Sequence, residues 1–289
     1  MHSSHPSKVS TLRGQLLGQQ MRQLRQQTGL TLEQAAAYLN RDQSGLGRFE
    51  RAEWPFPRQD VQLLLDLYGV GERPMRDYYL RLSEEAWRRD EWETEFDDAI
   101  YDRSFVDLPW LEGRATHIFA FDLGHVPGLL QTPEYAAALI REAETAQATD
   151  ALIARWVEMR MKRQTVLQGA QPIRFTSVLT ESVLRARTGG DEVMRAQLDH
   201  LARLARRHHI EVRVLPMSAG AGAGVDGAFM VFGMPQPYPE VAYVEHFGGR
   251  IFLEWPKSTR FVQLYDRLTA SALTPKESGE LIMTIAEEL

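Results

Sequence analysis

Residues 31 to 51 hold two short helical patterns joined by a three-residue turn, and this arrangement restricts the fold more than any other feature of the chain. The segment begins T-L-E-Q, a capping box in which the Thr and Gln side chains satisfy backbone N–H groups that a helix leaves free at its start. We expect this helix to span Leu32 to Leu39. Asp42 is a suitable cap for the next helix, which we expect over residues 43–51.

Helical spacing of apolar residues continues on both sides of this pair. Leu and Met residues recur at the period of a helix between Leu12 and Gln27, and Gly29 is placed to end that helix. A further apolar pattern predicts a helix from Val61 to Tyr68. Short amphipathic helices in this order predict a compact all-α bundle of four or five helices.

The helix expected over residues 43–51 contains Gly45 and Gly47. Each glycine inside a helix costs about 1 kcal/mol relative to alanine. A helix without β-carbons at these positions can bring its backbone close to a neighbouring helix or to a binding partner. Inward packing of Leu46 and Phe49 can offset the lost helix propensity.

Beyond residue 110 the patterns change to alternating strands and helices. Ile210–Leu215, for example, alternates apolar and charged residues as a half-buried strand does. The predicted strands are 173–179, 210–215, 228–232, 241–245 and 250–254, with a hairpin turn at Gly248-Gly249. The predicted helices are 133–141, 151–168, 191–208, 258–272 and 274–287. This half therefore has the pattern of an α+β domain with a mainly antiparallel sheet.

A chain of 289 residues is long enough for two domains, and its charge is distributed unevenly. The net charge of −6 divides into +3 for residues 1–76, −7 for residues 77–108 and −2 for the remainder. We predict a helical domain over 1–76, an acidic helical linker over 77–109 and an α+β domain over 110–289. Only the first of these has the positive balance that suits a polyanionic partner.

Several classes of function are disfavoured by the residue content. The chain has no cysteine, which removes disulfides, thiolate nucleophiles and cysteine metal sites. Its eight histidines include no i, i+4 pair on one helix, so we expect no metal site. No nucleophile-and-base signature or paired-carboxylate motif is present, so we expect neither an enzyme nor a cofactor.

Three further patterns bear on possible functions. Gly222–Gly227 matches G-x-G-x-x-G, but the residues that follow read as a strand, whereas a bound pyrophosphate needs a helix start there, so we expect a loop. No apolar run is long enough to span a bilayer, so we expect no membrane contact and a cytoplasmic protein. The basic side chains along 155–163 are expected to form a solvated face.

The stretch "GLTLEQAAAYLNRDQSGLGRFE" resembles the Xre-type helix-turn-helix family, and "QSGLG" is similar to the recognition helix of lambda-repressor-like proteins. The resemblance implies a lambda-repressor-like DNA-binding bundle. It places Gln43 to bond adenine bidentately and Ser44 to contact a neighbouring base edge. Leu32 stands where relatives have a glutamine that braces the reading glutamine, so the target sequence does not carry over.

Double-stranded DNA is therefore the expected partner, with two sets of contact candidates. The candidates for base contact are Gln43, Ser44, Gly47 and Arg48. The candidates for phosphate contact are Arg22, Arg25, Thr31, Gln34, Arg51 and Arg58. The alternative for the arginines is a solvated charged face.

From Trp110 onward the chain resembles the C-terminal domain of actinobacterial (Streptomyces-type) Xre-family regulators, including WhiJ-like and antitoxin-like members. The resemblance rests on "VPGLLQTPEYAAALI", "ARWVEMRMKRQTVL", "TESVLR", "GGDEVMRAQLDHLARLA", "IEVRVLP" and "SALTPKESGELI". It implies a DNA-binding transcriptional regulator whose C-terminal domain binds a small cognate protein or a signal. The alternative is an antitoxin-like interaction module whose DNA binding serves autoregulation. Pairing two such modules on a two-fold site also favours a homodimer.

Overall fold

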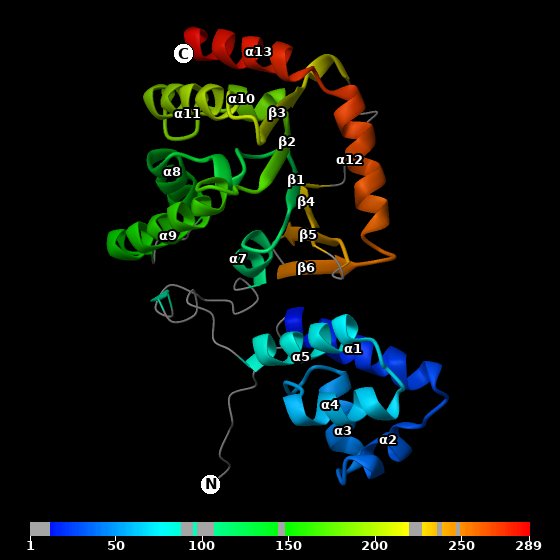
Figure 1. Cartoon of the computed structure of the whole chain (residues 1–289). Coiled ribbons are helices and arrows are strands. Elements are labelled where there is room, and N and C mark those ends of the chain that lie inside the picture. Colours follow the sequence, from blue (N-terminus) through cyan, green and yellow to red (C-terminus); the bar gives the residue numbers. More distant parts are fainter. Residues whose placement is uncertain are drawn as a thin grey trace. The chain divides into compact units, whose positions relative to one another are not determined.

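The computed structural model describes residues 12–87, 95–96, 107–143, 148–219, 227–235, 239–246 and 249–289 (Figure 1). The chain divides into two compact units, Met1–Trp110 and Leu111–Leu289. Because the positions of the two units relative to one another are not determined, each is described by itself.

The first unit is a bundle of amphipathic helices, as the sequence predicted. Its helices are α1 (Leu12–Gln27), α2 (Leu32–Tyr38), α3 (Gln43–Glu50), α4 (Arg58–Leu67) and α5 (Arg73–Trp87). Their apolar faces meet in a core that includes Leu17, Met21, Leu46 and Leu64, all of which are fully buried. α5 packs against α1 and α4 and completes this core.

Local signals fix the ends of the short helices. Thr31 and Gln34 form the expected capping box: the Gln34 N–H donates to the Thr31 hydroxyl, and the Thr31 N–H donates to the Gln34 side-chain oxygen. Asp42 caps α3 by accepting from the Gly45 N–H at 2.7 Å. Gly29, with φ of +72°, allows the chain to turn out of α1.

The predicted linker, residues 77–109, begins inside α5. Tyr78 and Leu82 of this helix are buried in the bundle, with exposed fractions of 2% and 0%. Further along, α7 (Asp107–Glu112) returns to α1, where Asp107 accepts a hydrogen bond of 2.8 Å from the Leu12 N–H. Most of the acidic residues between these helices lie outside the described ranges.

The second unit contains a six-stranded mixed sheet. Its strands are β1 (His117–Asp122), β2 (Arg174–Thr180), β3 (Ile210–Leu215), β4 (Phe229–Gly233), β5 (Val241–His246) and β6 (Gly249–Glu254), in the order β3-β2-β1-β4-β5-β6. Two neighbouring pairs are parallel and three are antiparallel, so the α+β prediction with a mainly antiparallel sheet is confirmed. β1 was not predicted, because its apolar run lacks a clear alternation.

Helices cover both faces of this sheet (Figure 1). On one side lie α8 (Pro133–Ala143), α9 (Asp150–Arg163), α10 (Glu181–Arg185) and α11 (Asp191–Leu204), with the short 3-10 turns η2 (Gly128–Leu130) and η3 (Gln164–Leu167). α12 (Thr259–Ser271) crosses the other side, where its Tyr265 and Leu268 pack on Phe121, Val178 and Val231.

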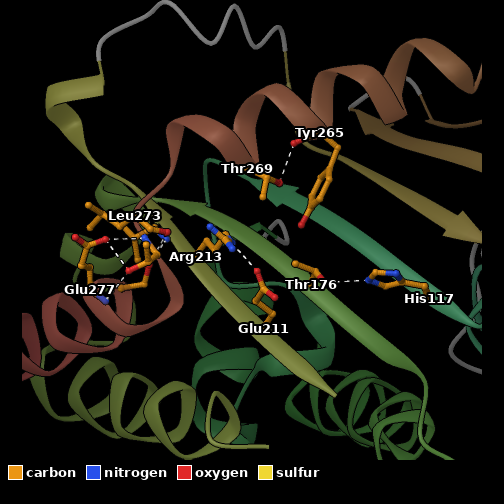
Figure 2. Close-up of polar contacts among 11 residues, drawn as sticks. His117, Thr176, Glu211, Arg213, Tyr265, Thr269, Leu273 and Glu277 are labelled. Carbon is orange, nitrogen blue, oxygen red and sulfur yellow. Dashed lines mark hydrogen bonds and ion pairs between the residues drawn. The ribbon is translucent and has the colours of Figure 1, made fainter. Parts of the chain in front are cut away.

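The β3 edge of the sheet is closed by the last helix, α13 (Pro275–Glu288). The Leu273 N–H donates to the Val214 carbonyl, and the Val214 N–H donates to the Ser278 hydroxyl, both at 2.9 Å. Figure 2 shows Leu273 and Glu277 at this edge, together with the polar side chains of Glu211 and Arg213 on β3 itself. The backbone groups of Val214 that point away from the sheet are therefore satisfied within the unit.

Candidate nucleic-acid interface

The first turn of α3 presents the two residues expected to contact bases. Gln43 and Ser44 are exposed, and their side chains start from a helix end fixed by Asp42. Both residues carry uncharged hydrogen-bonding groups, as direct readout of base edges requires. The geometry is that of the second helix of a helix-turn-helix, which offers its N-terminal residues to the major groove.

Gly47, also expected at the bases, lies instead against α2. Gly47 is buried, and a β-carbon there would lie 3.3 Å from the Leu32 side chain and 3.0 Å from the Arg51 guanidinium. A β-carbon at Gly45 would lie 3.0 Å from the capping carboxylate of Asp42. The two glycines thus make room for the helix cap and for the packing of the helix pair, and Gly47 is not available to DNA.

Arg48 lies on the next turn of α3 and is half-buried. Its guanidinium stacks over Trp54, 4.6 Å from the ring centroid, while the Trp54 side chain remains 48% exposed. This contact holds a cation and an aromatic ring together beside the exposed turn of α3. Sequence analysis missed Trp54, although an aromatic residue directly after a predicted recognition helix was a usable signal.

Arg25, expected at a phosphate, is buried and engaged inside the bundle. Its guanidinium donates to both carboxylate oxygens of Glu50, at 2.7 and 3.0 Å, and to the Leu30 carbonyl at 2.9 Å. The hydrogen bond to Glu50 raises the pKa of Arg25, so the guanidinium stays charged. This bidentate pair ties α1 to the last residue of α3, and it removes Arg25 from the set of surface cations.

Close packing reinforces the same contact between α1 and α3. A β-carbon at Gly18 of α1 would lie 2.7 Å from the Glu50 carbonyl oxygen and 2.8 Å from that of Phe49. Only glycine fits this approach without displacing backbone. The rear of α3 is therefore held by both an ion pair and a backbone contact.

Thr31 and Gln34 are exposed, and each uses its side-chain oxygen in the capping box of α2. The Gln34 amide nitrogen has no part in those two bonds. Arg22 is exposed on α1 and has no ion-pair partner among the described residues. These three positions remain compatible with a phosphate backbone passing over the start of α2.

Arg51 and Arg58 are exposed, and both are paired with carboxylates. Arg51 binds Glu53 at 2.6 Å, and Arg58 binds Glu84 at 2.7 Å. The hydrogen bond from Arg51 lowers the pKa of Glu53, which keeps that carboxylate charged. A phosphate would have to compete with these side chains for either arginine.

Arg41, in the turn before α3, was also missed. Its guanidinium pairs with Asp60 of α4 at 2.5 Å and lies 5.4 Å from the centroid of the Phe49 ring. Its side chain is 40% exposed, so a cation lies directly ahead of Gln43. The turn composition gave no hint of this role, because the partner comes from a later helix.

The second unit buries two arginines of α9. Arg163 donates to both oxygens of Glu112, at 2.9 and 2.6 Å, and the Glu112 side chain is fully buried. Arg160 donates to the Gln131 side chain at 2.9 Å, and burial lowers its pKa to about 10. The expected solvated face along 155–163 is therefore wrong for Arg163, whose partner is distant in sequence.

Asp122 ends β1 as an isolated buried carboxylate. Burial raises its pKa to about 7. The nearest charged candidate is His125, whose Nδ1 lies 3.7 Å from Asp122 Oδ1. Burial lowers the pKa of His125, so its ring is neutral at pH 7 and does not compensate the carboxylate.

Three other predictions concerned a glycine-rich loop, a metal site and a membrane span. Residues 220–226, which hold most of the glycine-rich Gly222–Gly227 segment, lie outside the described ranges. Within the described ranges, no three His, Asp or Glu side chains gather as a metal site would require. None of the described helices has the length and apolar character of a membrane span.

Two families match this chain. A helix-turn-helix domain matches residues 16–78, which cover α2 and α3 and most of the surrounding bundle. A domain of unknown function, DUF5753, matches residues 105–284, almost the whole of the second unit. Neither the curated proteins nor the solved structures compared with the chain include a match. The chain belongs to the DUF5753 family, and it carries a helix-turn-helix domain ahead of that domain.

Proposed function

We propose that the protein is a sequence-specific transcriptional regulator that reads DNA with the first turn of α3. The observation that carries this proposal is the exposure of Gln43 and Ser44 on a short helix whose opposite side is held rigidly by Glu50 and Gly18. Because the opposite side of α3 is already fixed, less conformational entropy is lost when the Gln43 amide and the Ser44 hydroxyl bind a ligand. The match of residues 16–78 to a helix-turn-helix domain supports DNA as the ligand.

Cations around α3 supply the attraction to the phosphate backbone. Arg22 and Arg41 are exposed, Arg48 is half-buried beside Trp54, and Arg51 is exposed next to Glu53. Arg41 and Arg48 thus join Arg22 and Arg51 as phosphate candidates, and the buried Arg25 is no longer one of them. Because carboxylates share some of these cations, we expect moderate affinity per domain and a strong dependence on salt.

We further propose that two copies act together, since a single bundle contacts one half-site and two joined bundles combine their affinities. In this proposal the second unit joins the two copies and binds a small cognate protein or ligand. The protein binds DNA in the cytoplasm. Co-purification of the full chain from its native host tests the partner. A small protein that binds residues 111–289 and releases the DNA would favour the antitoxin-like alternative.

The test of DNA reading starts with selection of a site from random duplexes by the full chain. Binding to that site is then compared between the native protein and the variant Gln43→Ala with Ser44→Ala. We expect the variant to lose about 10- to 100-fold in affinity for the selected site, because each good base contact contributes about 1–3 kcal/mol of discrimination. Affinity for unrelated DNA should change little.

The matched control is Gln23→Ala with Gln27→Ala, two exposed amides on α1. The control should keep full affinity for the selected site. Arg48→Ala should weaken binding to all duplexes and reduce the slope of affinity against salt by about one phosphate contact. The proposal fails if no site is enriched, or if the α3 variant binds the enriched site as tightly as the native chain.

A further inference from the structure

The two edges of the second unit's sheet differ. At the β3 edge, Val214 is hydrogen-bonded to Leu273 and Ser278, and α13 packs along the strand. At the other edge, no strand pairs with the outer side of β6 in the described part of the chain. Ile251 in the middle of β6 is 42% exposed, and Trp255 directly after it is 71% exposed.

β6 lacks several of the features that normally protect an edge strand. Its pairing with β5 runs without a bulge through six consecutive pairs, from Val241–Glu254 to His246–Gly249. The strand reads G-R-I-F-L-E and contains neither proline nor lysine. A regular edge with apolar side chains and no such protection is a template for pairing with another strand.

The order of residues in β6 is complementary to itself in an antiparallel arrangement. When two copies are related by a two-fold axis at Phe252, Arg250 of each faces Glu254 of the other, and Ile251 faces Leu253. Opposite charges and apolar pairs directly across a sheet are both stabilising. Shifting the axis to Ile251 would place Arg250 opposite Phe252 and lose the charge pairing.

The charges within one copy favour this register. Glu254 is half-buried and has no ion-pair partner among the described residues, and burial raises its pKa to about 7. Arg250 binds Glu245 of the neighbouring strand at 2.8 Å. A guanidinium has five N–H donors, so Arg250 can keep Glu245 and also receive a second carboxylate.

We propose that two copies of this chain pair through β6, antiparallel about Phe252, so that their sheets join into one. The proposal deepens the homodimer part of the proposed function and names its interface. Arg250 and Glu254 set the register of the pair, Ile251 and Leu253 supply the apolar contact, and the outward backbone groups of β6 make the new ladder.

The first experiment reverses charges in the full chain and measures the dimer by sedimentation. Arg250→Glu and Glu254→Arg each place like charges opposite each other, and each should weaken the dimer roughly tenfold or more. A mixture of the two variants restores both opposite-charge pairs and should form a heterodimer of near-native affinity. Arg267→Glu, on the exposed side of α12, is the matched control and should change nothing.

The second experiment uses the absence of native cysteine. Phe252→Cys in an otherwise unchanged chain should crosslink to the same residue of a second copy, because side chains directly opposite in a sheet have Cβ atoms about 5 Å apart. Arg267→Cys should not crosslink. This readout does not require the charge variants to remain fully stable.

The proposal is overturned if the chain is monomeric at about 100 µM, or if it dimerises without a crosslink at position 252 and without sensitivity to the charge reversals. The outcome is separable from the test of DNA reading. A chain that enriches a DNA site but dimerises elsewhere rejects only the β6 pairing. A chain that crosslinks through position 252 but enriches no site rejects only the reading by α3.

Discussion

The two units of the protein each bury a bidentate arginine–glutamate pair, but the pairs have different surroundings. In the first unit Arg25 and Glu50 lie behind α3, whose front carries exposed polar groups. In the second unit Arg163 and Glu112 join α9 to α7, and the Glu112 side chain is fully buried. The same kind of contact therefore supports an exposed helix face in the first unit and anchors a helix in the second.

The largest effect is expected from Glu112→Ala. This change removes the carboxylate that binds the buried Arg163 guanidinium through two hydrogen bonds, and we expect the free energy of unfolding of the second unit to fall by about 3–5 kcal/mol. Calorimetry of the full chain measures the effect as a lowered transition. The control Glu158→Ala removes an exposed partner of Arg155 on the same helix, with a loss below about 1 kcal/mol. Equal losses in the two variants would contradict the anchoring role.

A somewhat smaller loss, about 3 kcal/mol, is expected from Glu50→Ala in the first unit, because Arg25 keeps its bond to the Leu30 carbonyl and retains some exposure. Calorimetry of the full chain measures it as a lowered transition of the first unit. The control Glu53→Ala breaks an exposed pair with Arg51 and should be almost neutral for stability. A neutral Glu50→Ala would show that Gly18 and the apolar core alone hold α3.

The third effect is expected from Asp122→Asn, and it depends on pH. The pKa of Asp122 is about 7 in the folded protein and near 4 in the unfolded chain, so the folded state keeps a proton that the unfolded state loses between these values. The native free energy of unfolding therefore falls as pH rises from 4 to 7. Asparagine cannot ionise, so the variant should be more stable than the native chain at pH 8, by up to about 4 kcal/mol for a difference of three pKa units.

The native chain and the variant should differ little in stability at pH 4, where Asp122 is protonated. Thermal denaturation of both proteins at pH 4 and pH 8 therefore checks this result. Asp266→Asn, at an exposed position of α12, is the control and should give the same small difference at both pH values. A constant difference for Asp122→Asn across the range would mean that its carboxyl group titrates normally in the folded state.

The bundle was predictable because its signals are local. A capping box at Thr31, an N-cap at Asp42 and apolar spacing within single helices placed α1 to α3 within one residue of their observed bounds. The exposure of Gln43 and Ser44 followed from their position after the cap. The role of Arg25 did not, because its partner Glu50 lies 25 residues away and a surface arginine has the same local pattern.

The second unit was predictable in class but less so in its connections. Alternation located β3 to β6, whereas β1, buried between β2 and β4, lacks a regular polar face. Whether neighbouring strands run parallel or antiparallel depends on crossovers that no short window contains. Buried polar contacts such as Arg163 with Glu112 likewise arise only when distant segments meet.

The hydrogen bonds that Ser278 and Leu273 make to the backbone of Val214 also bear on how many copies of the sheet could join edge to edge. A sheet that is unprotected at both ends can recruit strand after strand and grow into a fibre. In the dimer proposed above, both outer edges of the joined sheet are β3 strands. A further strand cannot pair with β3 at Val214, because a serine hydroxyl and one backbone amide already bind the backbone groups there.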